Sequence, residues 1–303
     1  MVIMLLIKKV EMENLEYYLE YLEYQKHYSF YTVDNYREDL EEFFAYLDRE
    51  GLSYLKLEYS DIRLYLMYLK DERKLKASSI DRHLSSLRGY YQYLEKENKV
   101  KSNVFSFIRG PKKDKILPHY FEYNEIEELF SINDMNNPLG VRNQLILELL
   151  YGTGVRVSEL VNIKINDINK EQRKIKIFGK GSKERYVLYG DYASDVLDKY
   201  LKEVYPSLRK QGDYLILNSH GGKITTRGVA YLLDEMIKKT SIHKNISPHM
   251  LRHTFATHLL NEGCDILSVQ ELLGHESLSS TQVYTHVSKE RLKEVYEKAF
   301  PRR

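Results

Sequence analysis

The sequence SPHMLRHTFATHLL, residues 247–260, predicts a helix that carries charged chemistry in its first turn. Ser247 is suited to cap this helix and Pro248 to occupy its first position, because the first backbone amides of a helix lack internal partners. His249 and Arg252 lie three residues apart and share a helix face, while the apolar residues around them point to a core. This helix end therefore offers an imidazole, a guanidinium and the positive end of the helix dipole to an anion.

A second stretch, LGHESLSSTQVY at residues 273–284, follows shortly after the first. Gly274 is placed to end a short helix and to leave His275 exposed on the next turn. Tyr284 comes nine residues after that histidine. A guanidinium, two imidazoles and a phenol at such short range indicate phosphate chemistry.

The same histidines admit a metal site as an alternative. His249 and His253 are four residues apart, so both could face a zinc ion with His275 as the third ligand. That arrangement would place Arg252 beside a dication on the same helical face, which is electrostatically unfavourable. We therefore expect no metal, and we interpret three histidines of this region as structural: His253, His258 and His286.

Two earlier stretches carry further cations. The sequence YGTGVRVSEL, residues 151–160, ends an apolar helix in a glycine turn and places Arg156 where the next helix begins. Taken alone, it is better explained by a plain helix–turn–helix with an Arg/Glu pair on its surface. Residues 174–188 predict a β-hairpin, because KIKIF alternates polar and apolar residues, GKGSK forms a turn and RYVL follows as a second strand. The hairpin tip carries Lys180 and Lys183.

The length of 303 residues predicts two domains, and charge divides the first of them. Residues 1–69 hold 7 Lys/Arg and 14 Asp/Glu, a net charge of −7. Residues 70–113 hold 12 Lys/Arg and 5 Asp/Glu, a net charge of +7. The second stretch is either a surface for a polyanion or an ordinary solvated helix face followed by a linker.

Apolar and aromatic residues recur at helical spacing from about residue 13 to residue 97, which predicts about four helices. Thr32, Ser60 and Ser78 are suitable helix starts. The segment RGPKKDKILP, residues 109–118, contains two prolines and four cations and predicts a linker.

We therefore expect a helical domain over residues 1–108, a linker over 109–119 and a second domain over 120–303. The fold class is mainly α with a small antiparallel sheet, which the hairpin provides. In the second domain the pattern predicts helices at residues 123–130, 140–151, 192–204, 226–239, 248–262, 266–273 and 289–298.

Neither a membrane anchor nor a disulfide is expected. No apolar run approaches the roughly 18 residues that span a bilayer, and the apolar residues 1–7 precede the first lysines, unlike the order in a signal peptide. Cys264 is the only cysteine, which excludes an intrachain disulfide and a site built from several thiolates. These features suit the reducing cytoplasm.

In order and spacing, four stretches resemble the catalytic boxes of the tyrosine recombinase (integrase) family: GTGVRVSEL (152–160), GKGSKER (179–185), PHMLRHTFATHLL (248–260) and LGHESLSSTQVYTHV (273–287). The helical first domain and its proline-containing linker resemble the core-binding, SAM-like domain of that family. The resemblance covers nearly the whole chain. Ser280 stands where threonine is frequent and Val283 where isoleucine is frequent, and neither departure touches a catalytic position.

The resemblance implies a six-residue active site: Arg156, Lys180, His249, Arg252, His275 and Tyr284. Tyr284 would attack a scissile DNA phosphate and leave a 3′-phosphotyrosyl link and a free 5′-hydroxyl. The two arginines would bind the non-bridging oxygens, the lysine would protonate the leaving 5′-oxygen, and the histidines would assist at the tyrosine and at the phosphate. Glu159 would orient Arg156 or a histidine. Because the covalent link conserves the phosphodiester energy, we expect no cofactor.

The resemblance also implies double-stranded DNA as the partner, with the two domains on opposite faces of the duplex. We expect phosphate contacts from residues 70–113 and from Lys112, Lys113, Lys183, Arg185 and Arg227. The tail at residues 289–301 is similar to the Xer branch of the family. That similarity implies resolution of chromosome dimers by a homo- or hetero-tetramer with a second recombinase on the DNA site, with a DNA translocase as a further candidate partner.

Three alternatives stay open on the sequence. An integrase of a mobile element would use the same chemistry on a different site. A type IB topoisomerase would relax supercoils without exchanging strands. A DNA-binding factor that has lost the chemistry would share the fold, although all six catalytic positions are filled.

Overall fold

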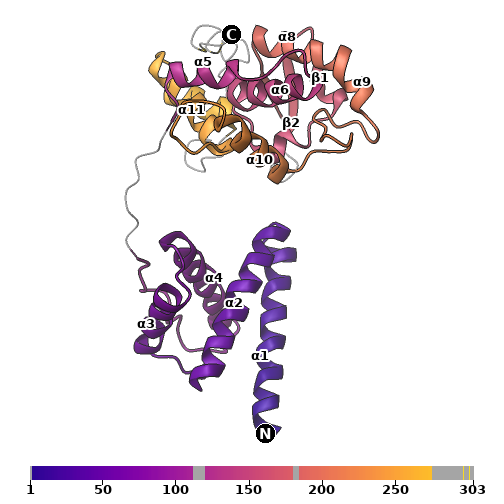
Figure 1. Ribbon diagram of the computed structural model, residues 1–303. Helices are drawn as coiled ribbons and strands as arrows, with labels where there is room; N and C mark the ends of the chain where they lie inside the picture. The colour runs from indigo at the N-terminus through magenta and orange to yellow at the C-terminus, as the bar shows by residue number, and fades with distance from the viewer. Residues whose placement is uncertain (1, 112–119, 180–183, 275–295, 297–299, 301–303) are drawn as a thin grey trace. The chain divides into compact units, whose positions relative to one another are not determined.

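The computed structural model describes residues 2–111, 120–179 and 184–274, together with Tyr296 and Phe300 (Figure 1). The chain divides into two compact units, Met1–Ile116 and Leu117–Arg303. They are called the N-terminal unit and the C-terminal unit below. The expected fold class, mainly helical with a small antiparallel sheet, is confirmed.

The N-terminal unit is helical throughout its regular structure. Its elements are α1 (Val2–Glu20), the π-helical turn η1 (Tyr21–Gln25), α2 (Phe30–Glu50), α3 (Tyr59–Met67), the π-helical turn η2 (Tyr68–Glu72) and α4 (Ala77–Lys96). The prediction of about four helices is confirmed for the described residues. The two π-helical turns, which extend α1 and α3, were not predicted, because the periodicity of apolar residues barely changes over a single turn.

The helix starts expected in this unit are wrong by a few residues. The cap of α2 is Ser29, whose hydroxyl accepts a hydrogen bond from the backbone amide of Thr32 at 3.3 Å. The start of α3 is fixed by Asp61, whose carboxylate accepts from the backbone amide of Glu58 at 2.9 Å. A hydroxyl or carboxylate on either side of the first turn can satisfy a free amide, so the position of the capping residue type alone leaves the start ambiguous.

Aromatic rings fill the core of the N-terminal unit. The largest fully buried side chains include Tyr18, Phe43, Tyr65, Tyr90 and Tyr91. Their rings meet edge-on or tilted, as in the 4.9 Å contact between the centroids of Phe43 and Tyr65. The buried side of the amphipathic helix α4 contributes many residues to this core.

The C-terminal unit combines helices with a small sheet. Its elements are α5 (Tyr123–Ser131), α6 (Pro138–Thr153), α7 (Val157–Leu160), the 3₁₀ turn η3 (Ile165–Asp167), β1 (Ile168–Asn169), β2 (Lys174–Phe178), β3 (Glu184–Leu188), α8 (Asp191–Lys199), the π-helical turn η5 (Tyr200–Val204), α9 (Tyr205–Leu208), α10 (Thr226–Ile237), α11 (Pro248–Asn261) and α12 (Ile266–Leu273). The strands form one antiparallel sheet in the order β1-β2-β3.

The expected hairpin is confirmed, with Ile175 opposite Val187 in its register. Strand β1 was missed because it is only two residues long and shows no alternation. The helix expected at residues 192–204 lies within a longer helical segment that runs from α8 through η5 into α9. The helix expected at residues 289–298 lies outside the described residues, apart from Tyr296.

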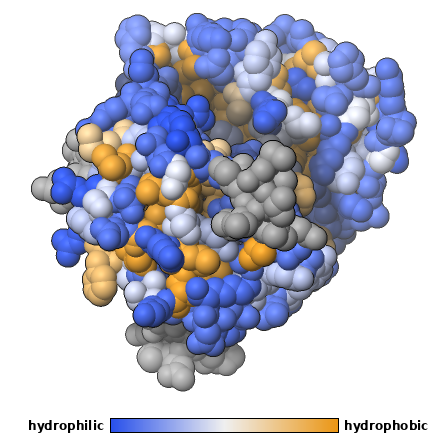
Figure 2. All heavy atoms as spheres, turned by 90° about the horizontal axis from the view of Figure 1, so that it is seen from below, coloured by the Kyte–Doolittle hydropathy of each residue, from blue (hydrophilic) through white to orange (hydrophobic). Residues whose placement is uncertain are grey.

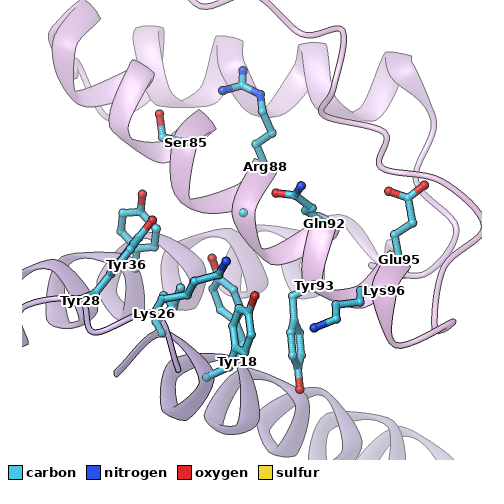
Figure 3. A pocket seen from close by; sticks show the side chains of 13 residues that line it. Tyr18, Lys26, Tyr28, Tyr36, Ser85, Arg88, Gln92, Tyr93, Glu95 and Lys96 are labelled. Carbon is cyan, nitrogen blue, oxygen red and sulfur yellow. The ribbon is translucent and has the colours of Figure 1, made fainter. Parts of the chain in front are cut away.

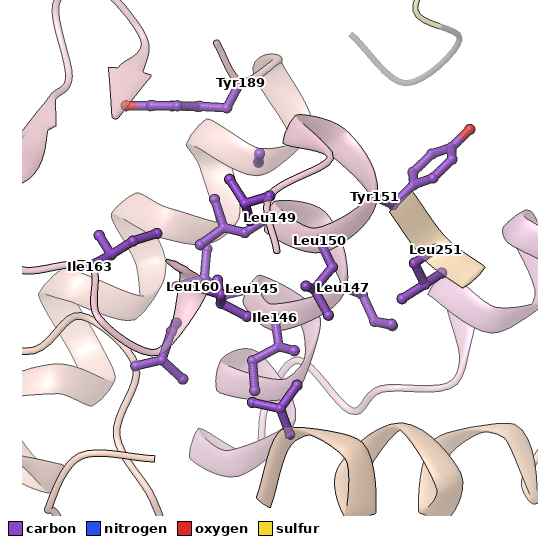
Figure 4. Packing of buried hydrophobic residues seen from close by; sticks show 14 of the residues in the cluster. Leu145, Ile146, Leu147, Leu149, Leu150, Tyr151, Leu160, Ile163, Tyr189 and Leu251 are labelled. Carbon is purple, nitrogen blue, oxygen red and sulfur yellow. The ribbon is translucent and has the colours of Figure 1, made fainter. Parts of the chain in front are cut away.

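Helix α6 is the centre of the C-terminal unit, and α8, η5 and α11 pack around it. Figure 4 shows buried side chains of α6 together with Leu160, Ile163 and Leu251 from neighbouring segments. The residues of α6 from Leu145 to Thr153 are all buried, so this part of the helix has no solvent face. Its last turn also receives the tail of the chain, since the Tyr296 hydroxyl donates to the Gly152 carbonyl at 2.9 Å. The ring of Phe300 lies 5.1 Å from that of Tyr151. The contacts of Tyr296 and Phe300 therefore hold the end of α6 in place where the glycine turn begins.

Hydrophilic side chains occupy most of the surface in view in Figure 2, with apolar side chains exposed between them. Phe30, Tyr31 and Phe107 are among the most exposed large apolar residues. None of the described helices is both long and apolar enough to cross a membrane.

Candidate active site

Arg252 binds two glycine-containing turns of the C-terminal unit, at Gly154 and at Gly274. It lies in the first half of α11, which starts at Pro248 with Ser247 as its cap, as expected. Arg252 is only 5% exposed. One terminal nitrogen donates to the carbonyl of Gly154 and the other to the carbonyl of Leu273 at 2.7 Å. Both of these acceptors are backbone carbonyls, which fix the position of the guanidinium group.

The Gly154 turn presents Arg156. Gly154 has φ +60°, and an added Cβ would lie 2.6 Å from Cδ1 of Phe255, so both conformation and space require glycine here. The turn ends α6 and starts α7, with Arg156 at the cap position of α7. The side chain of Arg156 is 43% exposed. This arginine can therefore reach an external ligand, whereas Arg252 is buried.

Glu159 holds Arg156 from within α7. One carboxylate oxygen of Glu159 accepts from the side-chain Nη1 of Arg156 at 3.0 Å, and the other accepts from the backbone amide of Arg156 at 2.8 Å. Glu159 is 6% exposed. A buried carboxylate with charge-assisted hydrogen bonds fixes the geometry of its partner.

A third arginine, Arg185 on β3, binds the same carboxylate. Its Nη1 donates to Oε1 of Glu159 at 2.7 Å and its Nη2 to Oε2 at 2.8 Å, a two-pronged ion pair. The side chain of Arg185 is 18% exposed. Two guanidinium groups thus bind one carboxylate, and Arg252 is close enough for the charge of Glu159 to influence it.

Arg156, Glu159, Arg185 and Arg252 are called the arginine cluster below. Their hydrogen bonds and burial explain the pKa shifts of Glu159 and Arg252. Burial opposes ionisation of Glu159, but the hydrogen bonds from Arg185 and Arg156 outweigh it and lower the pKa of the carboxyl. Burial lowers the pKa of Arg252 to about 10, with the charges of Arg156 and Arg185 acting in the same direction. That value lies above neutral pH, so the four groups together carry a net charge of about +2 at pH 7. A partly buried site with this charge is suited to bind a phosphodiester.

The structure brings four of the singled-out residues together: Arg156, Glu159, Arg185 and Arg252. His249 lies exposed in the first turn of α11 and Arg227 lies exposed in the first turn of α10. The remaining residues lie outside the described residues: Lys112, Lys113, Lys180, Lys183, His275 and Tyr284.

The sequence did not predict the pairing of Arg185 with Glu159, and Arg185 was expected among the phosphate contacts. Strand β3 alternates, with Val187 buried, Arg185 partly buried and Tyr186 exposed between them. This alternation places Arg185 on the inward face of the strand. This alternation lies within the strand expected at residues 185–188, so it could have placed Arg185 on the same face as Val187.

The structure supports a structural role for His258. His258 is fully buried, its Nδ1 lies 2.8 Å from the hydroxyl of Tyr151, and its ring stacks on Tyr123 with centroids 4.0 Å apart. Burial lowers its pKa, so it is neutral at pH 7, as a packing residue would be. Among the described residues, no three His, Cys, Asp or Glu side chains cluster as metal ligands would. The zinc alternative also required His275, which lies outside them.

The N-terminal unit contains an open pocket of about 570 Å³ lined by five tyrosines and three cations (Figure 3). The Nζ atoms of Lys26 and Lys96 lie 5.7 and 5.4 Å from the centre of the Tyr21 ring. Burial raises the pKa of Tyr18 and of Tyr36 in this pocket. Raised pKa values make these phenols poorer nucleophiles than an ordinary tyrosine.

Several cations of the basic stretch at residues 70–113 have partners within the N-terminal unit. Arg82 lies 2.8 Å from a carboxylate oxygen of Asp39, and Arg88 donates to the carbonyl of Ile108 at 3.0 Å. Arg73 pairs with Glu42. These charges therefore also stabilise the fold, and phosphate contacts from the stretch stay a prediction.

Two family descriptions match the chain. The phage integrase family matches residues 119–291, and the phage integrase N-terminal SAM-like domain matches residues 15–98. Tyrosine recombinase XerC of Anoxybacillus flavithermus is 45% identical over 299 residues, which cover 96% of this chain and 100% of the relative. Tyrosine recombinase XerC of Bacillus subtilis is 42% identical over 299 residues, which cover 96% and 98%.

A solved structure gives the same result for the fold. The XerH site-specific recombinase, crystallised on a palindromic difH substrate as a post-cleavage complex, superposes with a TM-score of 0.69 at 27% sequence identity. The match covers 86% of this chain and 78% of that chain.

Proposed function

The chain belongs to the phage integrase family of tyrosine recombinases, site-specific enzymes that cleave and rejoin DNA, and we propose that it does so through Tyr284. The phenol oxygen of Tyr284 would attack the scissile phosphorus while the bond to the 5′-oxygen breaks. The products are a 3′-phosphotyrosyl link and a free 5′-hydroxyl. Attack of a second strand's 5′-hydroxyl on the link reverses the step and exchanges the strands.

The observation that carries this proposal is the arginine cluster. Negative charge grows on the non-bridging phosphate oxygens during attack, and a planar guanidinium can bind two of them at once. Arg156 is partly exposed and held by Glu159, while Arg252 is buried and held by two backbone carbonyls. Such preorganised positive charge stabilises the transition state more than the ground state.

The remaining roles are assigned by similarity to the family. Lys180 would give its proton to the leaving 5′-oxygen, which balances the proton that Tyr284 loses. His249 would accept or relay the proton of the tyrosine, and His275 would hydrogen-bond the phosphate. The link keeps the energy of the phosphodiester, so rejoining needs no nucleotide or metal.

We further propose a role in resolving chromosome dimers before cell division, in the cytoplasm and on the nucleoid. The XerC relatives, which align over nearly the whole of their own length, support this assignment. The complex of the XerH recombinase with its difH substrate supports a double-stranded recombination site as the partner. The active assembly would be a tetramer, alone or with a second recombinase, and a DNA translocase would be a further partner.

A suicide substrate tests the catalytic proposal. Sites would first be selected from random duplex DNA by binding to the native chain, then nicked close to the scissile phosphate so that the released fragment diffuses away. We expect a covalent protein–DNA adduct with the native chain and none with Tyr284→Phe, at equal DNA binding. An adduct formed by Tyr284→Phe, or its absence with the native chain when DNA is bound, would overturn the proposal. Supercoil relaxation without recombinant product would favour the topoisomerase alternative.

A further inference from the structure

The carboxylate of Glu159 is shared unequally between two arginines. Its Oε1 atom accepts from Arg156 at 3.0 Å and from Arg185 at 2.7 Å. Its Oε2 atom accepts from the Arg185 side chain at 2.8 Å and from the Arg156 backbone amide at 2.8 Å. Arg185 is therefore the partner that engages both side-chain oxygens through its guanidinium.

The charge balance depends on that third arginine. Glu159 is buried, so water screens its negative charge poorly and a neighbouring cation must compensate it. With Arg156 as the only partner, the two groups would form a neutral pair, and the attraction of Arg156 for an external phosphate would be reduced. With Arg185 present, Arg156 keeps an uncompensated positive charge on its exposed side.

Arg185 also touches the turn that ends α12. Gly274 has φ +65°, and an added Cβ there would lie 2.7 Å from both Cδ and Nε of Arg185. The side chain thus passes directly over the backbone of Gly274, the residue before His275. Arg252 binds the same turn through the carbonyl of Leu273. The loss of Arg185 would therefore loosen Glu159 and the end of α12 together.

We propose that Arg185 is a positioning residue, which neutralises and orients Glu159 so that Arg156 stays in place with its positive charge available to the scissile phosphate. The proposal rests on the role assigned above to Arg156. It replaces the expectation that Arg185 contacts DNA directly, because both of its terminal nitrogens are already engaged with Glu159.

Two substitutions of Arg185 separate charge from hydrogen bonding. Arg185→Gln can still donate to Glu159 but carries no charge, whereas Arg185→Lys keeps the charge without the two-pronged geometry. Single-turnover cleavage at saturating DNA should fall roughly 10- to 100-fold in Arg185→Gln, a loss typical of residues that position a catalytic group, and by less in Arg185→Lys. DNA affinity should be unchanged in both variants.

A rescue experiment excludes a merely structural role. In Arg185→Gln the unneutralised charge of Glu159 should cancel that of Arg156. Adding Glu159→Gln removes this negative charge while the amide oxygen can still accept from Arg156, so the double variant should cleave faster than Arg185→Gln. If the two residues only supported the fold, the double variant would be as slow as the single variant or slower. Thermal unfolding of each variant checks that the rates refer to folded protein, and Arg185→Lys carries the test alone if Arg185→Gln does not fold.

The outcomes distinguish this inference from the proposed function. If the native chain forms no adduct on the suicide duplex, the proposed function fails. If the native chain forms the adduct and Arg185→Gln cleaves at the native rate, or the double variant shows no rescue, the positioning role of Arg185 is overturned. A loss of DNA affinity in Arg185→Lys as well as in Arg185→Gln, at native cleavage rate, would instead return Arg185 to the DNA contacts.

Discussion

Among the described residues, Asp39 in the N-terminal unit and Glu159 in the C-terminal unit are buried carboxylates beside arginine, and their pKa values shift in opposite directions. Asp39 on α2 is 1% exposed, and burial raises its pKa to about 6, although Arg82 and a hydrogen bond from Ser86 oppose the shift. The pKa of Glu159 on α7 is lowered instead, because hydrogen bonds from two arginines outweigh its burial. The number of charge-assisted hydrogen bonds, rather than burial alone, decides the charge of a buried carboxylate.

The surroundings of the two carboxylates differ in the same sense. His83 packs against Asp39, with its Nε2 atom 3.0 Å from Oδ1, and burial lowers the pKa of His83 to about 4. The group formed by Asp39, Arg82 and His83 therefore has a net charge close to zero, because His83 is neutral and Arg82 offsets the carboxylate. The cluster around Glu159 instead places three arginines, Arg156, Arg185 and Arg252, near one carboxylate, so positive charge exceeds negative charge there. A cluster that only stabilises a fold minimises its net charge, whereas an anion site maintains charge for a ligand.

The largest expected difference between the clusters is in catalysis. Arg156→Ala should slow single-turnover DNA cleavage by roughly 100- to 1,000-fold, because it removes a preorganised donor to the developing charge. Asp39→Asn should leave the cleavage rate unchanged, because Asp39 lies in the core of the other unit. Rapid-quench assays on the nicked duplex measure both. Equal losses in the two variants would mean that the rate reports general stability.

The next expected effect is on stability. Glu159→Gln should lower the free energy of unfolding of the C-terminal unit by about 3 kcal/mol at pH 7, because two adjacent arginines lose the charge that pairs them. Asp39→Asn should cost the N-terminal unit less, since its carboxyl is closer to neutrality and the amide can still accept from Ser86. Urea unfolding followed for each unit gives the two values, and a smaller cost for Glu159→Gln than for Asp39→Asn would contradict the comparison.

A third prediction concerns pH. The folded-state pKa of Asp39 is raised above its ordinary value, so the stability linked to its neutral form is fully present below about pH 4 and is lost as pH rises through about 6. Asp39→Asn cannot ionise, so the unfolding free energy of the variant relative to the native chain should shift in favour of the variant by about 2 kcal/mol between pH 4 and pH 8. Unfolding curves over that range measure the shift. A difference that does not vary with pH would show that Asp39 is ionised throughout.

The smallest expected effect compares two glycines that end helices. Gly51 at the end of α2 has φ +68° with nothing within 4 Å of an added Cβ, whereas Gly274 at the end of α12 has φ +65° with Arg185 at 2.7 Å. Alanine at either position should cost roughly 1–2 kcal/mol of left-handed strain. Gly274→Ala should cost about 1 kcal/mol more, because Arg185 must move away from Glu159, and it alone should slow cleavage. Equal costs, with equal cleavage rates, would mean that the Arg185 contact is dispensable.

Local rules in the sequence were sufficient where one short segment decides the outcome. The pair Ser247-Pro248 predicted the start of α11, and the alternation of residues 174–178 predicted β2 within the confirmed hairpin. The π-helical turns and the start of α2 were not predicted, because competing caps and small changes of helical pitch differ little in energy at the sequence level. Likewise, the isolated pattern around Arg156 favoured an ordinary surface pair.

By itself, the sequence determined the family, the helical and hairpin segments and the residue types available for phosphate chemistry, because these depend on spacing along a few neighbouring residues. Only the tertiary structure decided that Arg185, 26 residues after Glu159, binds that carboxylate. It also decided that Arg252 binds the carbonyls of Gly154 and Leu273 in two separate turns. The physical reason is that contacts between a strand and a helix end are set by how the core packs around α6. Side-chain charge alone does not specify which surface a residue will face.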